Sequence, residues 1–209
     1  MRNNFSKFVL TVGFGLTIAL SSAYAQGLYL DVGGGIGSGT TKLSGLLGSK
    51  GELDVSDNAS FDLALEAFSL KVGYGPFPID IPIYVVGVIG GFAHQLKYSY
   101  GTAQYNSYLI GPGVVVYPID MLQLGLSAGI SWIANETISN SSITVNETGS
   151  GFAWEVSAAA NLGSVKHACL LGIKYFSANN EWKSSKVEQK SSMIGIFVKY
   201  AFRTKGGGE

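Results

Sequence analysis

Few residues of this chain have side chains that carry out chemistry. It contains two histidines, one cysteine and 13% charged residues, which leaves little for a metal site and excludes an internal disulfide. Acyl-transfer chemistry needs a histidine near a serine and a carboxylate that orients the ring. His94 instead shares one face of an expected strand with Phe92 and Leu96. We therefore expect no enzyme, no cofactor and no metal, and we expect Cys169 to face outward as a small apolar residue.

Charged residues that interrupt apolar segments are the other candidates. Asp31, Lys71 and Lys199 lie at similar distances from the ends of three such segments. They should therefore lie at the same level inside the folded protein. Because a buried charge is costly unless it is paired, we expect Asp31 to lie between the two lysines. Glu155 and Lys174 form a second expected pair. These charges either gate the passage of ions or simply fill the interior as a polar plug.

The composition limits the class of protein. Hydrophobic residues make up 46% of the chain and charged residues 13%, against about 25% charged in ordinary domains. This excludes a disordered chain. With 14 basic and 14 acidic residues and no basic cluster, we expect no nucleic-acid partner.

The first residues have the pattern of an export signal. Arg2 and Lys7 precede the apolar segment 8–20. Ala23 and Ala25 are small residues at the positions that a signal peptidase recognises before its cleavage site. We expect residues 1–25 to be a cleaved signal peptide, 26–202 a barrel and 203–209 a short tail. The alternative is a short N-terminal membrane anchor.

Beyond residue 26 the apolar residues recur at every second position, which predicts strands with two different faces. In the clearest segment, leucines and isoleucine alternate with glutamine, glycine and serine. Long polar loops are expected at 37–60, 135–150 and 177–190, alternating with short turns. The eight expected strands are 27–36, 63–74, 83–98, 105–117, 122–132, 152–162, 169–175 and 194–202.

Segments of this length can cross a bilayer as tilted strands if the sheet closes on itself. The apolar faces should meet lipid, including that of 83–98, which carries Tyr84, Val86, Val88 and Phe92. Mid-strand Pro112 predicts a bulge. We therefore expect an all-β, eight-stranded, antiparallel up-and-down transmembrane barrel; a soluble lipocalin-like barrel is the alternative. Two aromatic girdles are expected, one from Tyr74, Tyr84, Tyr200 and Phe202, the other from Phe92, Tyr98, Trp132, Phe152, Trp154 and Tyr175.

The chain resembles the small eight-stranded outer-membrane barrels typified by the OmpA membrane domain and OmpX. The most specific likeness is the last segment, in which Ile194, Ile196, Val198, Tyr200 and Phe202 share a face. It is similar to the aromatic-ended strand that the barrel-assembly machinery recognises, although seven further residues follow Phe202. The resemblance implies a bacterial outer-membrane protein in contact with outer-membrane lipid, with both termini periplasmic and long loops extracellular.

Two functions are compatible with this pattern. The first is a surface protein whose barrel presents loops for adhesion to host surface molecules, other host interaction or envelope integrity. The second is a narrow or gated channel for small solutes, including hydrophobic ones. An eight-stranded barrel is just wide enough for its own side chains, which argues against an open pore.

Overall fold

The computed structural model describes residues 27–44, 52–54, 67–75, 81–98, 101–140 and 144–203. The side chains of 52–54, 67–68, 94–98, 101–104, 134–140 and 144–146 lie outside this description. Within the described ranges, no helix has the length and apolar character needed to cross a bilayer.

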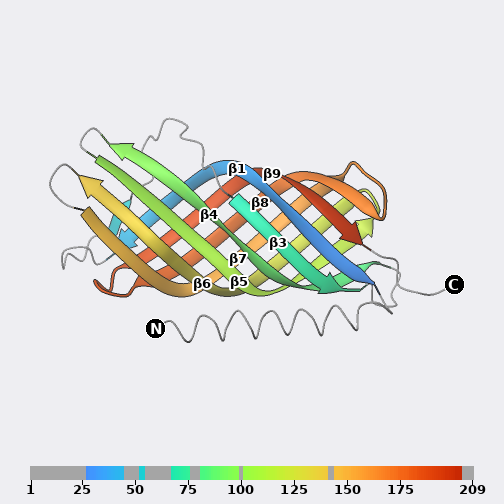
Figure 1. Ribbon diagram of the computed structural model, residues 1–209, viewed down its shortest axis with the longest axis horizontal. Helices are drawn as coiled ribbons and strands as arrows, with labels where there is room; N and C mark the ends of the chain where they lie inside the picture. Colours follow the sequence, from blue (N-terminus) through green and yellow to red (C-terminus); the bar gives the residue numbers. More distant parts are fainter. Residues whose placement is uncertain are drawn as a thin grey trace.

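The described strands form one antiparallel sheet that closes into a barrel (Figure 1). Each neighbour in sequence is a neighbour in the ring, and β1 pairs with β9 to close it. The short β2 pairs with the outer part of β1 and is not a member of the ring. The strands are β1 (Leu28–Ser44), β2 (Glu52–Asp54), β3 (Ala67–Tyr74), β4 (Ile83–Tyr98), β5 (Gly101–Ile119), β6 (Leu122–Asn140), β7 (Thr144–Asn161), β8 (His167–Trp182) and β9 (Glu188–Arg203). The predicted fold class, an eight-stranded up-and-down barrel, is confirmed.

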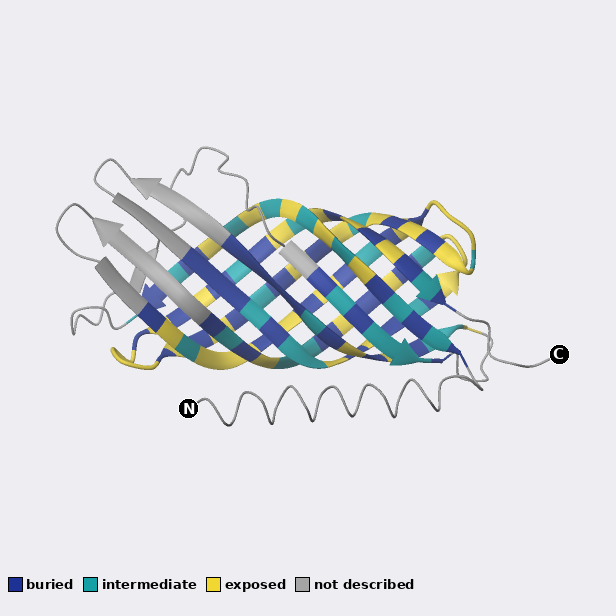
Figure 2. Cartoon of the chain, viewed as in Figure 1, coloured by how far each residue is buried: buried dark blue, intermediate teal, exposed yellow. Residues whose placement is uncertain are grey.

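Burial alternates residue by residue along the strands (Figure 2). On β8 and β9 every second side chain from Cys169 to Tyr175 and from Ile194 to Tyr200 is exposed, and the residues between are mostly buried. The same holds for the alternating residues of β6 and β7. For β1, β3 and β5 to β9, the predicted inward and outward faces are correct.

The facing of β4 was predicted wrongly. Tyr84, Val86, Val88 and Phe92 point into the barrel and are at most 2% exposed, whereas Val85 is 47% exposed. Both faces of this strand are apolar, so alternation alone does not distinguish inside from outside.

Neighbouring glycines explain why the larger side chains of β4 fit inside. Val86 lies opposite Gly73 on β3 and Gly113 on β5, and Val88 lies opposite Gly111 on β5. A Cβ atom on Gly73 would lie 2.5 Å from Val86 Cγ1, and one on Gly113 would lie 3.0 Å from Val88 Cγ2. These contacts show that the valines occupy space that the glycines leave open.

The strands run well beyond their predicted ends. Seven of the eight barrel strands have 16–19 residues, against about 9–11 needed to cross a bilayer. The segments 135–150 and 177–190, expected as loops, instead contain the paired ends of β6–β7 and β8–β9. Residues 183–187 connect β8 to β9, and 141–143 lie outside the described residues. Most residues of the two segments are polar, which hid the alternation, yet 135–150 contains several threonines, isoleucines and a valine, which suit a pleated strand. Of the third expected loop, 37–44 belongs to β1, 52–54 is β2, and the rest lies outside the described residues.

Pro112 does not produce the expected bulge. The pairs on either side of it, Ile110 with Ile130 and Gly113 with Ser127, keep one register. Register shifts in the β5–β6 ladder occur instead between Gln104 and Tyr108 and between Val116 and Ile119. Pro112 thus removes a backbone donor without inserting a residue.

The outer surface is an apolar belt with a sharp upper boundary. Outward pairs of β8 and β9 within the belt are Leu171–Val198, Ile173–Ile196 and Tyr175–Ile194. The next outward pairs are Ser177–Ser192, Asn179–Lys190 and Glu181–Glu188. Isoleucines 173, 194 and 196 are 57–60% exposed, which in water would be unfavourable over so wide a surface. An apolar exterior on a closed sheet is what a bilayer requires, so the barrel is transmembrane and the soluble alternative does not fit.

Aromatic residues flank this belt, although not all those predicted. Tyr200, Phe152, Trp154 and Tyr175 are 36–57% exposed on the outer face, and the rings of Trp154 and Tyr175 lie 5.3 Å apart. Tyr84 and Phe92 do not belong to the girdles, because they point inward. The side chain of Tyr98 lies outside the described residues.

Candidate functional site

The interior of the barrel is filled by side chains in successive layers. The lowest, at the end where β1 begins and β9 ends, contains Tyr29, Tyr84 and Tyr117, and we call it the tyrosine layer. The ring of Tyr84 lies 5.0 Å from that of Tyr29 and 6.2 Å from that of Tyr117. Gln123 Nε2 donates to Tyr29 Oη at 2.6 Å and to Tyr117 Oη at 3.0 Å. These hydrogen bonds join three strands across the lower end of the lumen.

Arg203 completes this end. Its guanidinium carbon lies 3.7 Å from the centroid of the Tyr117 ring. Its Nε donates to Val165 O at 2.6 Å, and its Nη2 donates to Asp120 Oδ1 at 3.2 Å. Arg203, the first residue of the expected tail 203–209, is the last residue of β9; residues 204–209 lie outside the described residues. The alternation from Lys199 through Ala201 could have placed Arg203 in the lumen.

Above the tyrosine layer lie Asp31, Lys71, Glu155, Lys174 and Lys199, which we call the charge layer. All five were predicted to face the interior, and each is at most 3% exposed. Asp31 lies on β1, between the strands that carry Lys71 and Lys199, but it pairs with only one of these lysines. Lys199 Nζ lies 3.6 Å from Asp31 Oδ1, but Lys71 Nζ crosses the lumen to lie 2.8 Å from Glu155 Oε1.

The second expected pair is present and belongs to the same network. Lys174 Nζ lies 3.9 Å from Glu155 Oε2, so Glu155 lies between Lys174 and Lys71. Asp31 Oδ2 also accepts a hydrogen bond from Tyr29 Oη at 2.8 Å. The charge layer is thus tied to the tyrosine layer below it. Spacing along the chain could not predict which carboxylate each lysine pairs with, because the pairing depends on contacts across the barrel.

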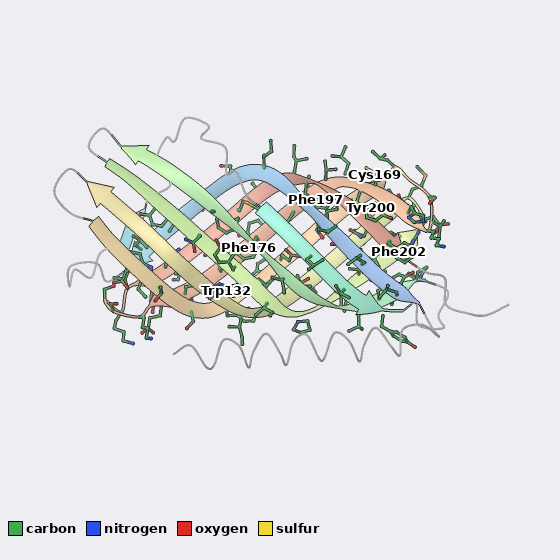
Figure 3. All side chains as sticks on the ribbon, in the orientation of Figure 1. Trp132, Cys169, Phe176, Phe197, Tyr200 and Phe202 are labelled. Atoms are coloured by element: carbon green, nitrogen blue, oxygen red, sulfur yellow. The ribbon has the colours of Figure 1, made fainter. Side chains whose placement is uncertain are left out.

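The layer above is apolar, and we call it the upper apolar layer. It contains Phe92, Leu109, Phe176 and Met193, with Ala153 and Ala178. The rings of Phe92 and Phe176 meet edge to face at 5.2 Å. Phe176 of this layer is labelled in Figure 3. Of the other residues labelled there, Phe197 faces the interior, whereas Tyr200 and Cys169 face outward.

The outer end of the lumen is closed by another packed cluster: Leu43, Tyr105, Ile133, Trp182 and Val187. Trp182 Nε1 donates to Gln189 Oε1 at 2.6 Å, and Gln189 Nε2 donates to Ser191 Oγ at 3.1 Å. Aromatic, charged, apolar and mixed layers therefore follow one another through the described lumen.

The ends of the hairpins that extend above the apolar belt expose polar groups. In the β8–β9 turn, Lys186 has a positive φ of 58° and its Nζ lies 3.0 Å from Glu181 Oε1. Thr148, Ser150, Glu181, Lys183 and Lys186 surround a polar depression between the ends of β7 and β8. Sequence reasoning placed this region in a loop and so missed its fixed geometry.

The proposed assembly residues lie together on the outer face of β9: Ile194, Ile196, Val198, Tyr200 and Phe202. Tyr200 Oη lies 2.6 Å from His167 Nδ1 on β8. Ala23 and Ala25 lie outside the described residues, as does the side chain of His94. Cys169 is exposed on the outer face as expected. Among the described residues, no three His, Cys, Asp or Glu side chains gather as metal ligands would.

These features define a class: a closed, eight-stranded, antiparallel transmembrane barrel with a filled interior. Solved structures similar to the chain include Ail, the attachment invasion locus protein of Yersinia pestis, at 12% identity over 83% of this chain and 98% of that chain, with a TM-score of 0.47. Neisserial surface protein A is 14% identical over 82% of this chain and 95% of that one (TM-score 0.44). Outer membrane protease OmpT from Escherichia coli is 10% identical over 86% and 97%, respectively (TM-score 0.48). No protein-family model matches the chain, and no curated protein matches its sequence.

Proposed function

We propose that this protein is a bacterial outer-membrane surface protein whose barrel is a rigid scaffold. The outer ends of its hairpins carry the function, which is adhesion, another host interaction or support of the envelope. Binding groups are commonly placed on connections that a rigid frame holds in position.

The filled lumen is the observation that carries this proposal. Tyr29, Lys71, Phe176 and Trp182 represent four successive layers, and each of these side chains is at most 2% exposed. A solute would have to displace several packed side chains to pass. The parts of the molecule that remain accessible to partners outside the bilayer are its two ends.

The outer end is the better candidate for binding. Above the apolar belt, β8 and β9 continue as a paired hairpin whose outward residues are serine, asparagine, lysine and glutamate. Its turn is held by Lys186 N donating to Trp182 O at 3.1 Å and by Lys183 N donating to Thr148 O at 2.8 Å. Exposed charges at Glu181, Lys183 and Lys186 are therefore presented in a fixed arrangement.

The orientation in the membrane is part of the proposal. Leu28 at the start of β1 and Arg203 at the end of β9 lie at the same end as the turns 120–121 and 162–166. We assign this end to the periplasm and the extended hairpins to the cell exterior. The partners would be outer-membrane lipid along the belt, the barrel-assembly machinery at the last strand, and host surface molecules at the outer hairpins. We propose no enzymatic activity.

One observation favours the second function, a gated channel. Arg203, which covers the lower end of the lumen, is paired with Asp120, whose side chain is 68% exposed. An ion pair with an exposed partner contributes little to stability, so breaking this pair would be a first step in opening the lower end of the lumen.

Expression in a non-adherent bacterial strain tests the leading proposal. Cells carrying the wild-type protein should adhere to cultured host cells, or resist detergent, better than cells with the empty vector. Replacing 183–186 or 135–150 by a glycine-serine turn should remove this gain, while heat-modified gel mobility shows that the barrel still folds. Lys174→Met, buried in the lumen, is the matched control and should keep the gain. A folded hairpin variant with wild-type adherence and detergent resistance would contradict the proposal.

A further inference from the structure

The charge layer contains three cations and two anions. Lys71, Lys174 and Lys199 face Asp31 and Glu155, and all five side chains are buried. With every lysine protonated and both carboxylates ionised, the layer has a net charge of +1. On each of the eight barrel strands, the inward residues at this height lie within the described ranges.

The layers on either side do not neutralise this charge. The tyrosine layer below contributes Arg203, whose carboxylate partner is Asp120 at the lower rim. The upper apolar layer contributes phenylalanine, leucine, methionine and alanine. A net charge enclosed between such layers is strongly unfavourable unless a counter-charge enters or a buried group changes its protonation.

Lys174 is the lysine with the weakest compensation. Lys71 lies 2.8 Å from Glu155 Oε1. Lys199 lies 3.6 Å from Asp31, donates to Ser69 Oγ at 3.2 Å, and lies 4.6 Å from the centroid of the Phe197 ring. Lys174 reaches Glu155 only at 3.9 Å, and it must share that carboxylate with Lys71.

Two serines lie opposite Lys174 and its carboxylate partner. Ser157 on β7 is directly opposite Lys174 on β8. Ser127 on β6 is opposite Glu155, is 1% exposed, and its Oγ has no hydrogen-bond partner among the described residues. Ser157 Oγ and Lys71 Nζ both approach Gly125 closely, because a Cβ atom there would lie 2.6 Å from the hydroxyl and 3.2 Å from the ammonium group.

We propose that the lumen binds one small monovalent anion, a halide in chemical class, beside Lys174. The ammonium groups of Lys174 and Lys71 supply the charge, and the hydroxyls of Ser127 and Ser157 donate hydrogen bonds. Charge-assisted hydrogen bonds of this kind are strong in a medium that excludes water. The bound anion brings the net charge of the layer to zero. This inference does not depend on the function of the outer hairpins.

Refolding the full mature chain in detergent, with chloride replacing gluconate at constant ionic strength, tests the proposal. The urea midpoint of unfolding should rise with chloride in the wild type, because an anion that binds the folded state stabilises it. Lys174→Met sets the layer charge to zero and should remove the chloride dependence. Glu155→Gln sets it to +2 and should make the dependence steeper.

Two outcomes of the unfolding measurement would overturn the proposal. One is a wild-type midpoint that does not change when chloride replaces gluconate. The other is an equal shift in wild type and Lys174→Met, which would mean that chloride acts on the surface. Should a variant fail to refold, bromide-soaked crystals of the wild type decide the matter. An anomalous peak beside Lys174 would support the site, and its absence at saturating bromide would refute it.

Discussion

Lys71 on β3 and Glu155 on β7 form an ion pair across the barrel, with 2.8 Å between Nζ and Oε1. In the ring order of the strands, β3 and β7 lie opposite each other, so this pair spans the lumen rather than joining neighbours. It connects the two halves of the sheet at the height where the interior is most polar. The pair therefore obstructs the lumen directly, in addition to any contribution it makes to stability.

Removing the carboxylate of Glu155 should weaken the barrel substantially. Glu155→Gln leaves Lys71 and Lys174 without an anionic partner in a buried site, which costs about 3–5 kcal/mol of unfolding free energy. Urea unfolding followed by tryptophan fluorescence in lipid vesicles measures the effect.

The matched control for this variant is Glu181→Gln. Its carboxylate pairs with Lys186 at 3.0 Å, but the two side chains are 57% and 72% exposed, so the loss should stay below about 1 kcal/mol. If the two variants unfolded at the same urea concentration, the lumen pair would not be a structural contact.

A charge in the middle of the lipid-facing belt should also destabilise the fold. Val198 is 55% exposed at the centre of the outer face of β9, and Val198→Lys should cost about 2–4 kcal/mol near the bilayer midplane. Asn179→Lys, placed above the belt, should change the unfolding free energy little. Equal costs for the two variants would show that the belt has been assigned to the wrong height.

The orientation can be read by labelling cysteines on intact cells. In a Cys169→Ser background, Asn179→Cys lies above the belt on β8, while Lys166→Cys lies on the opposite turn; both positions are exposed. A membrane-impermeant maleimide should label the first and spare the second until the cells are broken. Labelling of Lys166→Cys on intact cells would reverse the orientation proposed here.

The barrel could be predicted from the sequence wherever one face of a strand is polar and the other apolar. Leu122 to Trp132 on β6 is the clearest instance, because its inward residues are glutamine, glycine and serine. The facing of β4 could not be predicted, because Val85 and Val86 are chemically equivalent and the glycines that accommodate Val86 inside lie on the neighbouring strands. Prediction also failed at the hairpin ends, where mostly polar residues resemble a loop.

The interior charges could be predicted as a set, but their pairing could not. The alternation of inward and outward side chains along each strand places Asp31, Lys71 and Lys199 inside. Contacts across the lumen depend on the stagger of the whole sheet, which a single segment does not reveal. This is why Lys71 was assigned to Asp31, its neighbour on β1, when its partner is Glu155 on the far side.

Solute flux into liposomes that contain the refolded barrel distinguishes a scaffold from a channel directly. The stacked layers predict that small sugars and ions enter no faster than into empty liposomes, with the folded state verified by heat-modified gel mobility. Arg203→Ala should leave this result unchanged, because the charge layer and the upper apolar layer still fill the lumen. Flux through the folded wild-type protein above that of empty liposomes would contradict the scaffold account and make the protein a channel.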